Sequence, residues 1–547
     1  MTPIELAPDY YLHNFRRLID TVEQRYQDLL SDDESHWVVQ FRGLTAEAQM
    51  LYVRLLSRKG EFFRLGKLSY PEIGDLACAA RALADRGLIE WHQHTWPTEQ
   101  LAALFTKPEL LSRFPALSPF KQARKPQLVE ALAARAPAPE DFGDDILRIC
   151  HQQYLSTFLL LFFGNRHQDL SQFVLTDLGL HQFEAYPVDR NNRLFTARQQ
   201  IEQWLMLSDL SDQYWQAKDR KDPEPIPALA QQIPATYDWP PLERRRQKLI
   251  NLIARDLERA EHFDVALALF RQSELPPSRE RQARILNKLG DPDSALTLAR
   301  QMRQAPHNEE EADVAARLEK KLCRQLNHPF APVPEPDITE SHLQLAYTGQ
   351  RVELAVAEYY TVQGWQVFYT ENSLLCGLFG LAFWDIIFAP VPGAFLNPYQ
   401  RAPRDMFQPE FTQQRQGQIQ QRLQDIAQGR WQHWHRVYDA KYGLSNDWVN
   451  WPLLPPELLT LSTACFSGPL LARLFERILF DPRSNRAGLP DLILFQSGQY
   501  LWVEVKGPGD KLQSNQIRWL RTFAELNIPA RVDYVRWNNN ADEPDQP

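Results

Sequence analysis

The sequence predicts a multidomain, mostly α-helical protein that ends in a smaller α/β domain. The chain has 547 residues, too many for one hydrophobic core. Helical periodicity dominates residues 1–326, where the proline-rich stretches 219–241 and 327–337 read as linkers. Near the end, the runs LILF and YLWVEVK are rich in branched and aromatic residues, which is typical of strands. We therefore expect three domains, over residues 1–225, 226–330 and 338–540.

Composition places the chain among ordinary globular proteins. Hydrophobic residues make up 44% of it, and no run approaches the apolar length of a membrane span. The opening MTPIELAPDYYLHNF lacks the basic-then-apolar plan of a signal peptide, and five scattered cysteines fit a reducing cytosol. The net charge of −9 argues against indiscriminate coating of nucleic acid, but it leaves room for local basic patches.

The N-terminal region, 1–225, contains two candidate DNA-binding modules. Residues 51–91 alternate helices with turns and close on the strand-like GLIEW, a pattern compatible with a winged-helix-like unit. Residues 118–136 look like one helix of a SAP-type module, which we place at about 115–140. Basic clusters in both suit phosphate contacts that do not read bases, although a charge run is more often a solvated face. The candidate residues are Arg58 and Lys59, beside Arg54, Arg64 and Lys67, and in the second module Lys121, Arg124 and Lys125.

The middle region, 226–330, is helical and contains a loose internal repeat. RAEHFDVALALFRQS and LGDPDSALTLARQM share a turn followed by an A-L-x-L helix start, as in helical-hairpin repeats of the TPR kind. The segment SRERQARILNK places Arg279, Arg281 and Arg284 in the first turns of a helix. Arginines near a helix N-terminus suit a terminal phosphate, but the same pattern also describes exposed helix arginines.

The densest signal in the last domain is GLPDLILFQSGQYLWVEVKGPGD at 488–510. If Ser497-Gly498 is a two-residue hairpin loop, register counted outward from it places Asp491 directly opposite Glu504. Alternation puts Lys506 on the same face as Glu504. Two opposed carboxylates repel unless a cation lies between them, and Mg²⁺ takes such oxygen ligands. The parts describe metal-assisted phosphodiester hydrolysis, and the simpler alternative is a solvated salt-bridge cluster.

Other polar residues of this domain are weaker candidates. Glu353 opens the helical pattern VELAVAEYY, where an acidic residue often only compensates the helix dipole. Asp385, in the apolar run LFGLAFWDIIF, suits a cap or a core hydrogen bond as well as a metal. His433 and His435 have no third ligand nearby, so we expect a structural or stacking role.

The spacing PD-x(12)-E-x-K resembles the PD-(D/E)xK nuclease signature. VEVKGPGDKLQSNQIRWL resembles the virus-type replication-repair nuclease (VRR-NUC) branch of that superfamily, which continues with Asp510, Leu512, Gln516 and Trp519. YYL at 10–12, LYVRL with RK at 51–59, LFGL with WDIIF at 378–388, and NPYQ at 397–400 extend the resemblance to the Fanconi-associated nuclease family. It implies a helical N-terminal region with a SAP-type module, a TPR-like domain and a C-terminal restriction-endonuclease-like nuclease domain.

The resemblance also implies an activity. Members of the family are structure-selective DNA nucleases that cut 5′ flaps, digest from a 5′ end, use Mg²⁺ or Mn²⁺, and act in interstrand cross-link repair. Carried over, two ions are held by Glu353, Asp491, Glu504 and the Val505 carbonyl, while Lys506 positions phosphate or water and Glu371 is an accessory acid. Arg279 and His307 match the pair that anchors a 5′ phosphate, with Arg281 and Arg284 nearby. The sequence shows no N-terminal Cys/His ubiquitin-binding zinc finger, which indicates a bacterial-type member.

Two other interpretations stay open, namely a Holliday-junction or restriction-type nuclease and a catalytically inactive DNA-binding scaffold. The long helical front argues against the design of a small dimeric resolvase, and the intact Asp/Glu/Lys triad argues against the scaffold. We expect branched or 5′-flap duplex DNA as the partner of a monomer or DNA-dependent dimer, with no membrane. The expected location is cytoplasmic and nucleoid-associated in a bacterium, or nuclear in a eukaryote.

Overall fold

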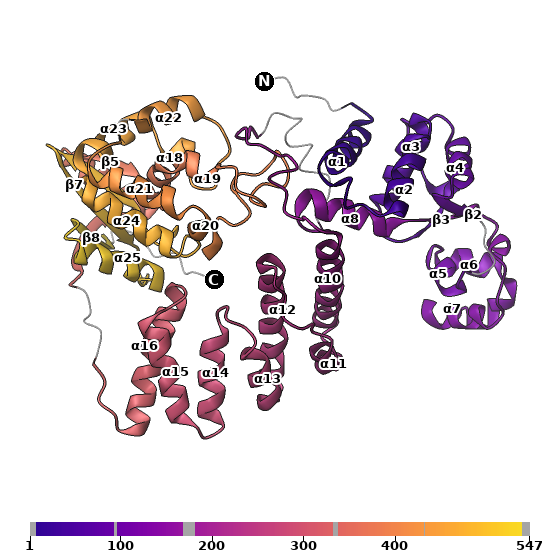
Figure 1. The fold of residues 1–547 in the computed structure, drawn as a ribbon, viewed down its shortest axis with the longest axis horizontal. Helices are drawn as coiled ribbons and strands as arrows, with labels where there is room; N and C mark the ends of the chain where they lie inside the picture. The colour runs from indigo at the N-terminus through magenta and orange to yellow at the C-terminus, as the bar shows by residue number, and fades with distance from the viewer. Residues whose placement is uncertain (1–6, 92–95, 168–180, 332–336, 432, 539–547) are drawn as a thin grey trace. The chain divides into compact units, whose positions relative to one another are not determined.

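The computed structural model describes residues 7–91, 96–167, 181–331, 337–431 and 433–538. These fall into two compact units (Figure 1). The first comprises residues 1–182, 187–198 and 395–400, and the second comprises 183–186, 199–394 and 401–547. The first unit therefore ends near residue 198, and the second contains both the middle helices and the C-terminal α/β domain. Part of the second proline-rich stretch, 332–336, lies outside the described residues.

The first unit is built from helices around a small sheet. The expected strand GLIEW forms β2, but its pairing partner β3 follows the SAP-like segment and was not anticipated from the sequence. The three strands are antiparallel in the order β1-β3-β2. The elements are α1 (Tyr10–Tyr26), α2 (Asp32–Arg42), α3 (Ala46–Leu56), β1 (Phe62–Arg64), α4 (Leu76–Asp85), β2 (Ile89–Trp91), β3 (Ile146–Ile149) and α8 (Gln152–Phe163).

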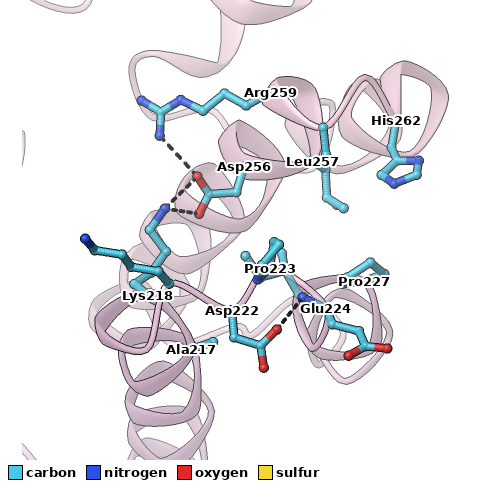
Figure 2. A pocket seen from close by; sticks show the side chains of 13 residues that line it. Ala217, Lys218, Asp222, Pro223, Glu224, Pro227, Asp256, Leu257, Arg259 and His262 are labelled. Atoms are coloured by element: carbon cyan, nitrogen blue, oxygen red, sulfur yellow. Dashed lines mark hydrogen bonds and ion pairs between the residues drawn. The ribbon is translucent and has the colours of Figure 1, made fainter.

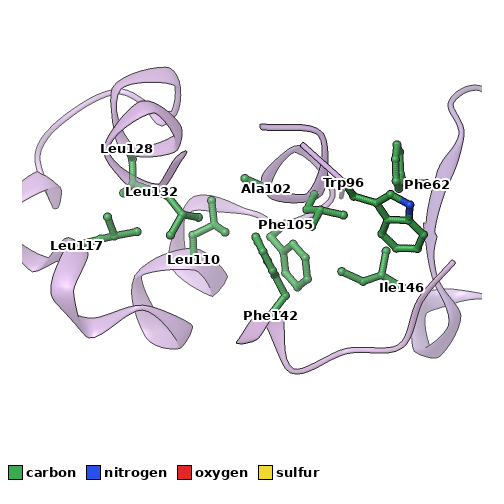
Figure 3. Close-up of a cluster of buried hydrophobic side chains, with 11 residues drawn as sticks. Phe62, Trp96, Ala102, Phe105, Leu110, Leu117, Leu128, Leu132, Phe142 and Ile146 are labelled. Atoms are coloured by element: carbon green, nitrogen blue, oxygen red, sulfur yellow. The ribbon is translucent and has the colours of Figure 1, made fainter. Parts of the chain in front are cut away.

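A small helical module lies between β2 and β3 in the sequence. The helix expected within 118–136 is α7, which begins at Lys125 with a proline in its first turn. Along the chain, the residues of its hydrophobic core extend from Trp96 to Ile146 and include Phe105 and Leu128, and Phe62 of β1 joins the same core (Figure 3). The packed module is thus longer than the expected 115–140 at both ends. Its helices are α5 (Thr98–Ala103), α6 (Lys107–Arg113) and α7 (Lys125–Ala133), with 3₁₀ turns at Pro115–Phe120 and Pro139–Phe142.

The middle region is a run of helices in which sequence neighbours from α12 to α16 pack against one another (Figure 1). The Ala-Leu pairs of both repeat copies, 266–267 and 295–296, are buried, as the A-L-x-L pattern predicts. The first proline-rich stretch is not a bare linker, because it contains the short helix α11. The helices are α10 (Arg198–Asp219), α11 (Ile226–Gln231), α12 (Pro240–Arg259), α13 (Phe263–Phe270), α14 (Ser278–Lys288), α15 (Pro292–Gln304) and α16 (Glu309–Leu326).

The C-terminal domain contains a five-stranded mixed sheet in the order β4-β8-β7-β6-β5. β8 is parallel to both β4 and β7, whereas β6 is antiparallel to β7 and β5. α17 packs against β5, β6 and β7, where Val356 and Tyr360 join a core with Val503 and Val505. The elements are β4 (Thr339–Ala346), α17 (Val352–Val362), β5 (Gln366–Tyr369), β6 (Leu492–Gln496), β7 (Gln499–Lys506), α25 (Ser514–Glu525) and β8 (Ala530–Asn538).

Seven further helices complete this domain between β5 and β6 in the described part of the chain. Asp385 does not enter the core, because its side chain is 69% exposed and pairs with Arg422 at 2.8 Å. Trp434 is buried between the two histidines at 433 and 435. Among the described residues, no single helix is long and apolar enough to cross a membrane, and α23 and α24 pass that test only as a pair bent by 113°. The helices are α18 (Ser373–Ala382), α19 (Trp384–Ile387), α20 (Pro409–Gln414), α21 (Gln416–Ala427), α22 (His433–Lys441), α23 (Pro456–Cys465) and α24 (Gly468–Phe480).

Candidate active site

The hairpin β6–β7 has the register that the sequence predicts. Ser497 and Gly498 form the loop with φ of +50° and +78°, the two positive values that a type I′ turn requires. The ladder runs from the pair Gln496–Gln499 to the pair at 492 and 503, so its next step places Asp491 opposite Glu504. A one-residue slip would put the two carboxylates on opposite faces of the sheet, and the turn chemistry prevents it.

Asp491 is held by backbone groups on both sides. Its Oδ2 accepts a hydrogen bond from Val505 N at 2.9 Å, and its carbonyl oxygen accepts from Thr370 N at 2.8 Å. The preceding turn contains Gly488, whose φ is +88° and whose missing Cβ would lie 2.7 Å from the carbonyl carbon of Asn515. Glycine is therefore needed for the chain to pass α25 and deliver Asp491.

Glu504 is buried with its partners on β7 and α25. Only 1% of this residue is exposed, and its Oε1 accepts hydrogen bonds from Lys506 Nζ and Gln516 Nε2, both at 2.6 Å. Lys506 is itself 7% exposed. The alternation expected for β7 is confirmed, because Glu504 and Lys506 face away from the core that receives Val503 and Val505.

Both central carboxyl groups have raised pKa values. Burial raises the pKa of Asp491 to about 6, and the nearby Glu353 and Glu371 carboxylates add to the effect. Burial also raises the pKa of Glu504 to about 7, with Asp491 as the largest charged contributor. Four carboxylates thus act on one another electrostatically, and a cation at this site would relieve their repulsion.

Glu353 and Glu371 lie at the rim of this group. Glu353 is in the first turn of α17, as predicted, and its Oε2 lies 3.4 Å from Arg351 Nε. Glu371 follows β5 and accepts a short hydrogen bond from the Tyr369 hydroxyl, which in turn accepts from Arg351 Nη2 at 3.1 Å. Arg351 and Tyr369 were not anticipated from the sequence, although Arg351 stands only two residues before Glu353.

The donor set fits a hard divalent cation, because carboxylate oxygens dominate it and two of them have pKa values raised by mutual repulsion and burial. As the side chains stand, however, no three Asp, Glu, His or Cys groups among the described residues converge closely enough to hold an ion. In this arrangement Lys506 pairs with Glu504 and Arg351 pairs with Glu353.

The expected phosphate-binding residues divide into two groups. Arg279 and His307 come together through the buried Glu311, which accepts from Arg279 Nη2 and from the His307 backbone N–H, both at 2.6 Å. Arg281 instead forms an ion pair with Glu258, and Arg284 pairs with Glu280 on its own helix. The structure therefore brings together Arg279 and His307 and directs the other two arginines elsewhere. Glu311 was missed, because its sequence context is an ordinary acidic helix start.

The N-terminal basic clusters are only partly available to a ligand. Arg64 is buried and pairs with Glu109 and Asp144, while Arg54 pairs with Glu72, so these two arginines are structural. The residues predicted to contact DNA are more accessible to solvent. Arg58, Lys59, Lys121 and Arg124 are exposed, and Lys125 is half-buried with its amine donating to the Ala103 carbonyl.

A cavity of about 720 Å³ lies in the middle region, at the C-terminal ends of α10 and α12 (Figure 2). Two of its acidic side chains have partners within the lining: Asp256 accepts from Lys218 and Arg259 at 3.0 and 3.1 Å, and the Asp222 side chain accepts from the Glu224 N–H. These contacts stabilise the junction of α10 with α12, and none of the predicted site residues lines the cavity.

Comparison with known proteins places the β6–β7 hairpin in a nuclease domain. Residues 421–537 match the VRR-NUC domain, and the match includes Asp491, Glu504 and Lys506. Fold and site together define a nuclease of the restriction-endonuclease-like class. Residues 9–90 match the FAN1 HTH domain, and residues 98–144 match the Fanconi anemia-associated nuclease SAP domain. Glu353 lies before the matched nuclease segment.

Full-length relatives identify the family. The chain is 37% identical to the Fanconi-associated nuclease 1 homolog of Pseudomonas aeruginosa, covering 98% of this chain and 97% of that protein. It therefore belongs to the Fanconi-associated nuclease 1 family and is a DNA nuclease of that family. Human Fanconi-associated nuclease 1 is 25% identical, and the match spans 62% of its length. The crystal structure of paFAN1 bound to 2nt 5′ flap DNA with gap superposes with a TM-score of 0.84 at 36% identity, over 98% of this chain and all of that one.

Proposed function

We propose that this protein is a divalent-cation-dependent nuclease that cuts 5′-flap DNA near the junction and digests DNA from a 5′ end. The observation that carries the proposal is the delivery of Asp491, Glu504 and Lys506 to one end of the β6–β7 hairpin, with the pKa values of both carboxyls raised. The similarity to a relative solved with 5′ flap DNA supports the choice of substrate.

In this proposal Asp491, Glu504, Glu353 and the Val505 carbonyl hold Mg²⁺ or Mn²⁺, with Glu371 as an accessory acid. The bound ions would polarise the scissile phosphate, activate a water molecule and stabilise the leaving 3′ oxygen. Lys506 would hold a phosphate oxygen or orient the water, and Gln516, which donates to Glu504 Oε1 at 2.6 Å, would orient that carboxylate. The number of ions that we propose is two.

A phosphate-anchoring site at Arg279 and His307 would set the distance from the 5′ end to the cut. Such a distance requires a rigid connection, and α16 provides one. The Glu309 backbone N–H donates to Asp481 at 3.1 Å, and Asp313 accepts from Arg518 of α25 at 2.6 Å. Since α25 also carries Gln516, one helix contacts both the catalytic strand and the helix next to the anchor.

A second group of cations in the same unit suits the DNA backbone. Desolvation and the neighbouring charges of Arg244 and Arg483 lower the pKa of Lys248, with Arg245 and Arg404 contributing further. Arg244 already pairs with Glu410 at 2.7 Å, so the exposed Lys248 is the member of this group that we propose contacts a DNA phosphate. The exposed cations Arg58, Lys59, Lys121 and Arg124, together with Lys125, would contact the duplex arms without reading sequence.

The test is cleavage of a labelled 5′-flap duplex in Mn²⁺ and in Mg²⁺. The parent should cut near the junction, and Asp491→Ala should bind the flap without cutting it. Equal cutting by both proteins would place the active site elsewhere, and binding without cleavage by the parent in either metal would favour a scaffold. A four-way junction should be tested in parallel, because preferential cutting of that junction over the 5′ flap would indicate a Holliday-junction resolvase.

The anchor has its own test, with a matched control on the same helix. Arg279→Ala should remove the preference for a 5′-phosphorylated over a 5′-hydroxyl end, whereas Arg284→Ala should keep it. Both variants cutting with the parent's pattern would exclude the anchor. By family membership we further propose a role in cross-link repair, at the nucleoid in a bacterial cell, by a monomer or a DNA-dependent dimer.

A further inference from the structure

Arg351 occupies an unusual place for an exposed arginine. Its side chain is 61% exposed, yet its guanidinium contacts two parts of the candidate metal site at once. Nε lies 3.4 Å from Glu353 Oε2, and Nη2 donates to the Tyr369 hydroxyl at 3.1 Å, with the guanidinium carbon 5.2 Å from the Tyr369 ring centre. Tyr369 links Arg351 to a second carboxylate, because the Tyr369 hydroxyl donates a hydrogen bond to Glu371.

Position in the fold explains why these groups meet. Arg351 is the residue before α17, and Tyr369 is the last residue of β5, where it pairs with the residue after Asp491. The backbone N–H of Glu371 also donates to the Asp491 carbonyl, at 3.2 Å. One arginine therefore bridges the two rim carboxylates on either side of Asp491. It is not needed as a helix cap, since its side chain makes no capping hydrogen bond.

Charge balance indicates what this bridge does. Four carboxylates, those of Glu353, Glu371, Asp491 and Glu504, act on one another, and the cations in contact with them are Lys506 and Arg351. Lys506 is buried, and its amine is fixed on Glu504. Arg351 is exposed, so its guanidinium can leave at little cost, as is general for surface ion pairs. It contacts Glu353 directly and Glu371 only through the Tyr369 hydroxyl.

We propose that Arg351 is a displaceable counter-cation that competes with the divalent ion for Glu353 and, through the Tyr369 hydroxyl, for Glu371. Arg351 is thus a positioning residue that weakens metal binding in the absence of DNA. This inference rests on the metal dependence proposed above.

The experiment is titration of the full-length protein with Mn²⁺ alone, with free Mn²⁺ counted by its electron paramagnetic resonance signal. Arg351→Gln removes the competing charge and should bind Mn²⁺ about three- to tenfold more tightly than the parent at low salt. Arg351→Lys keeps the charge but cannot bridge Glu353 and Tyr369 as a guanidinium does, so its Mn²⁺ affinity should lie between those of the parent and the glutamine variant. The gain in the glutamine variant should shrink as salt is added, because the charges are exposed.

Two controls separate this inference from the proposed function. Arg473→Gln removes another exposed arginine of the same domain, one that pairs with Glu476, and should leave Mn²⁺ affinity unchanged. Asp491→Ala should lose the binding. If the parent itself does not bind Mn²⁺ at millimolar concentrations, the metal site and this inference both fall. If the parent binds through Asp491 but Arg351→Gln binds equally or more weakly, only the role of Arg351 is overturned.

Discussion

Replacing Asp491 with asparagine should stabilise the metal-free protein at pH 8. The raised pKa of Asp491, from 3.8 to about 6, means that the fold resists ionisation of this carboxyl. The fold's preference for the protonated form is a stability contribution that is present below pH 3.8 and lost as pH rises through about 6. Asparagine is close in shape, stays neutral, and can still accept the hydrogen bond from Val505 N.

The magnitude follows from the size of the pKa shift. Each pKa unit corresponds to about 1.36 kcal/mol, so a rise of about two units makes the ionised carboxylate unfavourable by about 3 kcal/mol at pH 8. At pH 5 the folded-state carboxyl is mostly protonated, and linkage reduces the difference to about half of that value. Asp491→Asn should therefore unfold at higher denaturant concentration than the parent, by a margin that narrows on acidification.

The assay is urea denaturation in EDTA at pH 8 and pH 5, with the exposed substitution Asp385→Asn as a control that should stay within about 0.5 kcal/mol of the parent. Adding Mn²⁺ at pH 8 should stabilise the parent and not Asp491→Asn, since only a folded site with its ligand binds the ion. Two results would refute the reasoning: an Asp491→Asn variant no more stable than the parent at pH 8, or a stability gap of the same size at both pH values.

Three further substitutions test the contacts around the site. Lys506→Met leaves the buried Glu504 without its cation and should abolish cleavage and cost about 3 kcal/mol at pH 8 but less at pH 5, in the same denaturation assay. Gly488→Ala forces a Cβ against Asn515 at a positive φ, and we expect a loss of about 2 kcal/mol together with reduced flap cleavage. Gln516→Leu frees one lone pair of Glu504 and should slow single-turnover cleavage about tenfold, with under about 1 kcal/mol change in stability. Unchanged cleavage in the last variant would show that Gln516 does not orient Glu504.

The β6–β7 hairpin was predictable from the sequence because its turn depends on the residues of the loop itself. Its loop requires two residues that tolerate positive φ, and Ser497-Gly498 supplies them, so the register and the pairing of Asp491 with Glu504 followed by counting. The helix start at Glu353 followed equally well from its apolar pattern. In each case the decisive interactions lie within a few residues or across one tight turn.

Long-range partners were not predictable in the same way. β3 pairs with β1 and β2, strands from which a whole helical module separates it in the sequence. In the sequence, Arg64 belongs to a basic cluster. In the structure it is buried and pairs with Asp144, which follows the helical module along the chain. Whether an arginine binds DNA or stabilises the fold depends on such distant acids, and composition does not reveal them.

The same distinction explains how an acidic protein can contain a DNA-cutting site. The carboxylates of Glu353, Glu371, Asp491 and Glu504 repel DNA, and burial together with the neighbouring carboxylates raises the pKa values of Asp491 and Glu504, at a loss of stability. The buried Lys506 reduces that loss, because it lowers the pKa of both carboxyls, whereas the exposed Arg351 contacts Glu353 at the rim. In the function proposed above, these carboxylates outnumber the cations that contact them, so a divalent cation would bind favourably there and, with the ions in place, a phosphate would be able to approach.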